Sequence, residues 1–294
     1  MKVPQPFFQL ANSLLHPTQY DTPLLYPWRT HFLLRYLRWQ HNARFGARVS
    51  LEGPQKLCVI LLAWKRLHNM QPIVRSLLRA DFVDRIIVSN NNPEYRIADW
   101  VTLRDERLRL VDQPRRRAPG LRFELARDEG ASYFMSIDDD VFLYPEQVKR
   151  LFAELLARPQ APHGIQGERF VGDVTVSRTV PMALRQGWQV AIRDREEQVD
   201  VINTVYTFTA AHVEALYQRA HRLGIDVAEM SNGEDLLLSA SGTERPYIHD
   251  VGQVAECLSS TQMGVSTWRT RENFFRERTE LFKALQEPRS RESA

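Results

Sequence analysis

The chain has 294 residues, of which 43% are hydrophobic and 26% charged, with a formal net charge of +3. These values are ordinary for a globular protein that buries a sizeable core, and the mild charge gives no reason to expect a nucleic-acid partner. Two cysteines exclude a disulfide framework, and the longest apolar stretch, 57–64, is too short to span a bilayer. We expect a cytoplasmic protein.

The first 55 residues differ from the rest and predict a basic, aromatic N-terminal extension. No acidic residue occurs between Asp21 and Glu52, and five arginines in that stretch alternate with aromatic and aliphatic side chains. Such a segment, centred on residues 24–48, can lie on an anionic membrane surface. It can equally pack its apolar side on the main domain, and the pattern leaves both open.

From residue 57 onward the pattern alternates between buried strands and amphipathic helices. Strands are expected at 57–63, 85–89, 108–111, 133–138 and 201–208, and helices at 72–80, 121–130, 145–158, 213–220 and 272–285. This alternation predicts an α/β fold with a mostly parallel central sheet flanked by helices. We expect one domain over 56–285 and a disordered tail over 286–294.

Three consecutive aspartates, Asp138, Asp139 and Asp140, end the buried strand at 133–138. Clustered carboxylates repel one another at low dielectric unless a divalent cation lies among them. The carboxyl end of a strand is also where open α/β sheets bind ligands. A metal site is therefore one interpretation, and a solvated turn that begins the next helix is the other.

Other cofactor patterns are missing from the chain. No Gly-x-Gly-x-x-Gly, P-loop, His-Glu-x-x-His or paired Cys-x-x-Cys motif occurs, which disfavours dinucleotides, P-loop hydrolysis and zinc. Oxygen ligands alone suit Mn²⁺ or Mg²⁺, which commonly complete their shells with substrate phosphates. Arginines 115–117 and Arg122 precede the aspartates, and guanidinium groups bind phosphate bidentately; Arg122 is the better candidate.

A second acidic site follows at 231–235. Ser231 or Asn232 is expected to cap a helix whose first turn contains Glu234 and Asp235, where the helix dipole favours negative charge. The alternative is that Asp235 faces an acceptor hydroxyl as a base or orienting group. Two acidic clusters, one for metal and one for acceptor, suit transfer of a group from a diphosphate leaving group.

Short motifs at 63–66, 87–91, 122, 138–140, 164–169, 201–217, 233–236 and 264–269 occur in one order along the chain. This ordered set resembles the exostosin-type glycosyltransferases and covers residues 57–285. The resemblance implies a GT-A-like nucleotide-sugar-binding fold with an Asp-x-Asp motif. It also implies transfer of an N-acetylhexosamine such as GlcNAc from a UDP-sugar with Mn²⁺, and retention of anomeric configuration.

The resemblance also assigns residues, by matching position. The metal ligands are Asp140 and Asp138. His249 is either a further ligand, as in many GT-A enzymes, or a structural histidine. The catalytic pair is Asp235 and Glu234. Donor contacts come from Arg66, Asn90, Asn91, Arg122, Asp138, Asp139 and either Arg269 or Arg271. For a cytoplasmic enzyme, these assignments predict a glycan or glycolipid acceptor in polysaccharide biosynthesis at the inner membrane face.

This sequence departs from the family pattern at two places. Gly233 stands where the family has cysteine, and alignment on Trp268 places Thr270 at the position of the family's C-terminal arginine.

Two rival functions remain. Residues 137–142 fit the strand motif of haloacid-dehalogenase-type phosphatases, although Lys149 and Lys283 do not match that chemistry's lysine. A non-catalytic scaffold that binds nucleotide-sugar or glycan is the other.

Overall fold

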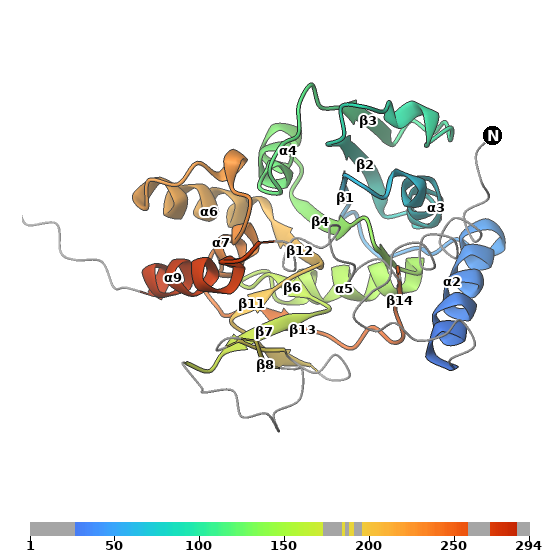
Figure 1. Ribbon diagram of the computed structural model, residues 1–294. Coiled ribbons are helices and arrows are strands. Elements are labelled where there is room, and N and C mark those ends of the chain that lie inside the picture. The colour runs from blue at the N-terminus through green and yellow to red at the C-terminus, as the bar shows by residue number, and fades with distance from the viewer. Residues whose placement is uncertain (1–26, 173–183, 186–187, 191–195, 258–270, 287–294) are drawn as a thin grey trace, which may run out of the picture. The chain divides into compact units, whose positions relative to one another are not determined.

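The computed structural model describes residues 27–172, 184–185, 188–190, 196–257 and 271–286 (Figure 1). These residues form two compact units. Unit 1 contains 27–116, 132–153, 251–257 and 271–272, and unit 2 contains 117–131, 154–172, 184–185, 188–190, 196–250 and 273–286. The start of the basic extension, residues 1–26, and the expected tail from 287 lie outside the described residues.

Unit 1 is built on four parallel strands in the order β4-β1-β2-β3. Their bounds are β1 Leu57–Ala63, β2 Val83–Asn90, β3 Leu108–Asp112 and β4 Tyr133–Asp138. All four were predicted to within two residues at either end. Strand β1 is buried along almost its whole length, as a central parallel strand covered on both faces must be. A mixed α/β fold with a mostly parallel sheet flanked by helices is thereby confirmed.

The remaining elements of unit 1 cover this sheet or connect its strands. They are α2 Pro27–Phe45, α3 Leu67–Leu77, the 3₁₀ turn η1 Ile97–Asp99, the first three turns of α5 Pro145–Ala157, and the antiparallel pair β5 Val141–Phe142 and β14 Ala255–Glu256. Helix α3 begins five residues earlier than predicted, so Pro72 lies inside it and not in its first turn. The apolar residues Leu67, Met70, Val74 and Leu77 form one buried stripe, and its burial compensates for the missing proline N–H.

Helix α2 packs one of its sides on the rest of unit 1. Trp39 is fully buried, its ring lies 4.7 Å from that of Phe142, and its indole Nε1 donates a 2.8 Å hydrogen bond to the carbonyl of Leu143. The opposite side exposes Leu34, Leu37 and Phe45. Part of the basic extension therefore packs on the domain, while its other face remains uncovered by the described residues. Among those residues, no helix has the length and apolarity needed to cross a bilayer.

Unit 2 combines short strands with helices. Strands β10 Glu197–Gln198, β13 Tyr247–Ile248, β6 His163–Gly164 and β12 Val205–Thr209 are neighbours in that order, and only the β13–β6 pair is parallel. A second sheet has the order β11 Val201–Ile202, β7 Gly167–Phe170, β9 Trp188–Val190 and β8 Leu184–Arg185. The helical elements are α4 Leu121–Glu129, the end of α5, α6 Ala210–Arg222, η2 Val227–Glu229, α7 Glu234–Ser239 and α9 Phe274–Gln286.

The predicted strand at 201–208 is wrong in one respect, because the chain breaks it into β11 and β12. Thr204 between them has φ = 64°, a left-handed conformation that interrupts an extended strand. β11 then pairs with β7 and β12 with β6, in different sheets of unit 2. The apolar run predicted the burial of both segments and missed the turn.

Replacing Trp39 with alanine should test the packing of α2. The substitution removes a fully buried indole and leaves the Leu143 carbonyl without its donor, so we expect a loss of about 3–5 kcal/mol in unfolding free energy. Urea denaturation measures the change. Leu37→Ala on the same helix, at a side that is 40% exposed, should cost less than about 0.5 kcal/mol. Equal effects of the two substitutions would contradict the packing described.

Candidate functional site

The carboxyl ends of the unit 1 strands bring several predicted site residues to one edge. Ala63 of β1 pairs with Asn90 of β2, Asn90 pairs with Asp112 of β3, and Leu62 of β1 pairs with Asp138 of β4. Because these strands are parallel, the segments that follow them leave the sheet on the same side. Arg66, Asn91, Asp139 and Asp140 stand in those segments. This is the edge at which open α/β sheets bind ligands.

Asp138, Asp139 and Asp140 are here called the aspartate cluster, and Arg66 binds the last two of them. The guanidinium Nη1 donates to Asp139 Oδ1 at 2.6 Å, and Nη2 lies 3.2 Å from Asp140 Oδ2. Arg66, Asp139 and Asp140 are all buried, while Asp138 is partly exposed. Burial alone would lower the pKa of Arg66, but the carboxylates of Asp140 and Asp139 raise it overall. Arg66 was predicted to border the nucleoside, and in this structure its partners are the aspartates.

Backbone contacts fix the same segment. The amide N–H of Trp64 donates to Asp139 Oδ2 at 3.3 Å, Asn69 Nδ2 donates to the Asp139 carbonyl at 2.7 Å, and the Cys257 N–H donates to the Asp140 carbonyl at 2.8 Å. The cluster offers three carboxylates at one strand end, and Arg66 pairs with two of them. An oxygen-only donor set of this kind fits a hard divalent cation such as Mn²⁺ or Mg²⁺.

Asn90 organises the loop that follows β2. Its buried side chain donates to the carbonyls of Asn92 and Tyr95 at 3.0 and 2.6 Å and to Asp112 Oδ1 at 2.8 Å, and its Oδ1 accepts from the Asn92 N–H. The side chain is thereby committed to loop structure. Asn91 is also buried. That Asn90 contacts a nucleotide therefore stays a prediction. Such a contact would have to come from its backbone or from neighbouring residues.

Two residues at this edge of unit 1 were not predicted individually as site residues. The guanidinium of Arg116 lies 4.5 Å from the centre of the Trp64 ring, a cation–π arrangement. The arginine run 115–117 was the available signal, but its pattern cannot say which member reaches an aromatic ring.

The two candidates for the C-terminal donor-binding arginine are Arg269 and Arg271. Arg271 belongs to unit 1 and is partly exposed, and Arg269 lies outside the described residues.

Unit 2 contains the second acidic site. Arg278 of α9 binds Asp235 of α7 through two parallel hydrogen bonds, Nη1 to Oδ1 at 2.8 Å and Nη2 to Oδ2 at 3.0 Å. Both side chains are buried, and Glu168 Oε2 lies 4.0 Å from Arg278 Nη2. Such a pair tolerates burial because each charge is hydrogen-bonded by the other. Asp235 is thereby fixed in one orientation.

Glu234 precedes Asp235 in the first turn of α7. Burial and then the adjacent Asp235 carboxylate raise the pKa of Glu234 to about 7, against the opposing pull of Arg122 and Arg278. Arg122 is itself buried and donates from Nη1 to the Tyr206 hydroxyl at 2.6 Å. A carboxyl group with a pKa near 7 can both accept and return a proton at neutral pH.

The start of α7 is not capped as predicted. The N-cap residue is Gly233, with φ = 84°, and it makes no side-chain cap hydrogen bond. This left-handed backbone conformation is one that glycine adopts without strain and other residues rarely adopt. Asn232 instead donates from Nδ2 to the Phe274 carbonyl at 2.9 Å. The expected Ser231 or Asn232 cap is therefore wrong.

Arg278 belongs to the second acidic site and was not predicted from the sequence. It lies on the same side of α9 as Phe274, Phe275, Leu281 and Phe282, and its guanidinium lies 5.4 Å from the Phe274 ring. An arginine at helical spacing within an apolar stripe signals a buried partner of opposite charge. That signal was present in the sequence, although it does not identify Asp235.

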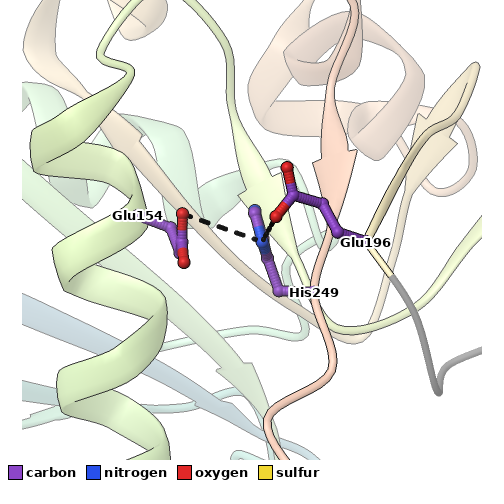
Figure 2. A group of neighbouring side chains, drawn as sticks. All are labelled: Glu154, Glu196 and His249. Atoms are coloured by element: carbon purple, nitrogen blue, oxygen red, sulfur yellow. Dashed lines mark ion pairs between the residues drawn. The ribbon is translucent and has the colours of Figure 1, made fainter.

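His249 follows β13 in unit 2 and is buried. Its Nδ1 lies 3.6 Å from Glu196 Oε2 and 3.9 Å from Glu154 Oε2. Dashed lines in Figure 2 mark these two ion pairs. His249 Nε2 lies 2.8 Å from His163 Nδ1. These neighbours differ from the aspartates that the resemblance assigned to it, and its role as a ligand with Asp138 and Asp140 stays a prediction.

Comparison with solved structures identifies the fold. A mannosyltransferase from Pyrobaculum calidifontis, solved in complex with GDP-Man and Mn²⁺, aligns at a TM-score of 0.51 and 14% identity, over 96% of this chain and 76% of that one. The chain therefore shares the fold of a GT-A glycosyltransferase. The match does not distinguish exostosin-type enzymes from other members of that fold class.

Two further structures align less completely. GalNAc-T7 with UDP, GalNAc and Mn²⁺ gives a TM-score of 0.47 and 9% identity, over 68% of this chain and 43% of that one. A CMP:2-keto-3-deoxy-manno-octonic acid synthetase complexed with CTP gives 0.37 and 11%, over 56% and 78%. The chain thus spans less than half of the GalNAc-T7 structure. No family model and no curated protein sequence matches the chain.

Replacing Arg278 with methionine should strongly destabilise the protein. The change leaves the Asp235 carboxylate buried without its cation, and breaking such a pair costs about 3–5 kcal/mol. Urea denaturation of both proteins measures the difference. Arg276→Met, at a side chain that is 65% exposed, is the control and should change stability by less than about 0.5 kcal/mol. A small effect at Arg278 would show that the ion pair does not hold Asp235.

Glu234→Gln should alter the pH dependence of stability. Between pH 4.5 and about 7 the folded chain holds a proton at Glu234 that the unfolded chain has released, so this carboxyl lowers stability as the pH rises through that range. The glutamine variant should therefore lose less stability than the wild type between pH 5 and 7.5. Thermal unfolding across that range checks this, with Glu214→Gln at an exposed position as control. Parallel curves would refute the raised pKa.

Proposed function

We propose that this protein is a metal-dependent glycosyltransferase that moves a sugar from a nucleotide-diphosphate donor to a glycan or glycolipid acceptor. The observation that carries the proposal is the aspartate cluster at the carboxyl edge of the parallel sheet, with Arg66 beside it. The fold match supports it, because the mannosyltransferase that aligns over 96% of the chain was solved with GDP-Man and Mn²⁺.

The donor we propose is a UDP-sugar, and the transferred group is an N-acetylhexosamine such as GlcNAc. The motif order along 57–285 supports this choice, as does its resemblance to exostosin-type enzymes, which transfer with retention. The alternative is a hexosyl donor, and a panel of UDP-sugars would distinguish the two.

Unit 1 would bind the donor. Asp138 and Asp140 would hold Mn²⁺, which when bound neutralises negative charge on the diphosphate leaving group. Arg66 offsets the repulsion between Asp139 and Asp140 and holds their carboxylates in a fixed orientation. Trp64 and Arg116 offer an aromatic face and a cation, a combination suited to a nucleoside and its phosphates.

Unit 2 would act on the acceptor. Asp235, held by Arg278, would orient the acceptor hydroxyl without changing its own position. Glu234, with a pKa of about 7, would accept the proton that this hydroxyl loses. Arg122 favours the charged form of Glu234 and would keep it available as a base.

The uncovered face of α2 supports peripheral contact with an anionic membrane. Leu34, Leu37 and Phe45 are 48%, 40% and 72% exposed, and the exposed Arg38 and Arg44 lie on the same helix. Apolar side chains with cations beside them are the pattern of helices that lie in a membrane interface. This contact, made through residues 24–48, would bring a cytoplasmic enzyme to a glycolipid or growing polysaccharide at the inner membrane face.

Two rivals predict different assay results. A non-catalytic scaffold would bind nucleotide-sugar without turnover. A haloacid-dehalogenase-type phosphatase would form an aspartyl-phosphate and release inorganic phosphate. Asp235 and the raised pKa of Glu234 favour the transferase, because binding alone requires neither.

Turnover of a UDP-sugar panel by the purified chain, with and without Mn²⁺, tests the proposal. We expect Mn²⁺-dependent release of UDP, and a loss of at least about 100-fold in Asp140→Asn, because removing one group that stabilises transition-state charge typically costs that much. UDP release is measured by a coupled assay and folding by circular dichroism.

Asp84→Asn is the matched control for this experiment. Asp84 is exposed near the start of β2, at the end of the strand opposite Asn90, and its variant should retain full activity. Undiminished Mn²⁺-dependent turnover in Asp140→Asn would remove the aspartate cluster from the mechanism. Phosphate release without UDP release would favour the phosphatase.

A further inference from the structure

Glu154, Glu196 and His249 form a cluster in unit 2, and its geometry supports a role for His249 different from the predicted one beside Asp138 and Asp140, which the proposed transfer leaves out. Glu154 lies in the last turns of α5, Glu196 directly before β10, and His249 directly after β13, and Figure 2 shows the three side chains converging. One ligand atom from each lies within 4.8 Å of the others. His249 is 3% exposed, so its ring is directed at the two carboxylates from within the protein.

A chain of hydrogen bonds determines the tautomer of His249, that is, which ring nitrogen carries the proton and which turns a lone pair toward the carboxylates. His163 Nε2 lies 2.8 Å from the Arg158 carbonyl, and a carbonyl only accepts, so Nε2 carries the proton. His163 is fully buried, which disfavours a charged ring and leaves its Nδ1 as an acceptor. His249 Nε2 therefore donates to His163 Nδ1 at 2.8 Å. In neutral His249, the Nδ1 lone pair points to Glu154 and Glu196.

The carboxylates are also oriented from outside the cluster. Arg158 donates from Nη1 to Glu196 Oε1 at 2.6 Å and from Nη2 to Glu154 Oε2 at 2.8 Å. Its guanidinium lies 4.5 Å from the Tyr247 ring, which supports it from one face. Glu196 Oε2 is left directed at His249. Metal-binding histidines typically donate their second N–H to a fixed acceptor, and metal-binding carboxylates are typically hydrogen-bonded, so both conditions hold here.

We propose that Glu154, Glu196 and His249 bind one divalent transition-metal ion, with Zn²⁺ the best match, at a site that shares no residue with the aspartate cluster. One imidazole and two carboxylates suit zinc, for which metal–ligand bonds of about 2.0–2.2 Å place tetrahedral ligand atoms roughly 3.4 Å apart. The separations of 3.6 and 3.9 Å from His249 Nδ1 need only a small contraction.

Such an ion would act as a structural link within unit 2. It would join the end of α5 to the segments at β10 and β13, which are otherwise connected through strands of two residues each. The side chain of Glu196 is 49% exposed, so the ion could enter from solvent and keep one water-filled position. Arg158 offsets one of the two carboxylate charges, leaving the site selective for a cation over an anion.

Zinc binding by the full chain tests this proposal. Protein freed of metal with EDTA is titrated with Zn²⁺ in the absence of nucleotide, and zinc per chain and the thermal midpoint are measured. We expect one tightly held zinc that raises the midpoint, as a ligand specific for the folded state must. Glu196→Gln should weaken this binding by more than the roughly 10–100-fold that outer-shell partners contribute.

Three further variants separate zinc binding at this cluster from zinc binding elsewhere on the chain. Glu244→Gln, at an exposed position, and Asp140→Asn in the aspartate cluster should both keep the zinc. His249→Gln should lose the zinc. If this buried substitution prevents folding, Glu196→Gln still tests the site, because Glu196 is exposed and its substitution should not affect folding. Zinc content does not depend on transferase activity, so failure of the proposed function would not affect this result.

Three outcomes would overturn the proposal. Glu196→Gln could bind zinc as tightly as the wild type, or Asp140→Asn could abolish all zinc binding. In the third, zinc adds no stability, while lowering the pH from 8 to 6 stabilises the wild type more than Glu196→Gln. That last result would show that a proton on His249, not a metal, satisfies the two carboxylates.

Discussion

The ion pairing of Arg66 with Asp139 and Asp140 is the interaction on which the proposed donor site depends. An apolar strand carries three consecutive carboxylates to the edge of a buried sheet, where their mutual repulsion is weakly screened. One guanidinium offsets part of that charge and positions two of the three groups. The remaining negative charge makes the edge attractive to a divalent cation, and a cation in turn makes it attractive to a diphosphate. Ligand binding and the stability of the empty site are therefore set by the same balance of charges.

Unit 2 contains two further pairings of an arginine with carboxylates, and their consequences differ. Arg278 binds both oxygens of Asp235, and Arg158 binds one oxygen each of Glu154 and Glu196. An arginine stays charged at physiological pH, and its planar set of N–H donors holds a carboxylate in a fixed position. The carboxyl group beside such a pair behaves differently: Glu234 feels burial and the charge of Asp235, and its pKa moves to about 7. In the proposed mechanism these two adjacent acids would have separate roles, Asp235 to orient the acceptor hydroxyl and Glu234 to exchange a proton.

Local patterns predicted most of the elements and failed where a conformation depends on partners elsewhere. The run at 57–63 forms β1, and the stripe following Pro145 forms α5, because burial of a continuous or periodic apolar face is written in neighbouring residues. Pro72 predicts the first turn of a helix, yet the buried stripe from Leu67 makes the helix begin five residues before it. The run at 201–208 was taken as one strand, yet Thr204 turns the chain so that its halves pair in different sheets. In both cases packing overrode a correct local preference.

The sequence by itself determined the α/β class, the parallel strands and the grouping of Asp138 to Asp140, since residues adjacent along a strand end must lie together in space. It also placed Glu234 and Asp235 in the first turn of one helix. Tertiary structure decided which cation each carboxylate meets. Arg66 lies 73 residues from Asp139 and Arg278 lies 43 residues from Asp235, and no local pattern records such pairings. They arise only when the packed strands and helices bring distant segments together, and that packing is what turns a list of acidic residues into groups with defined geometry and charge.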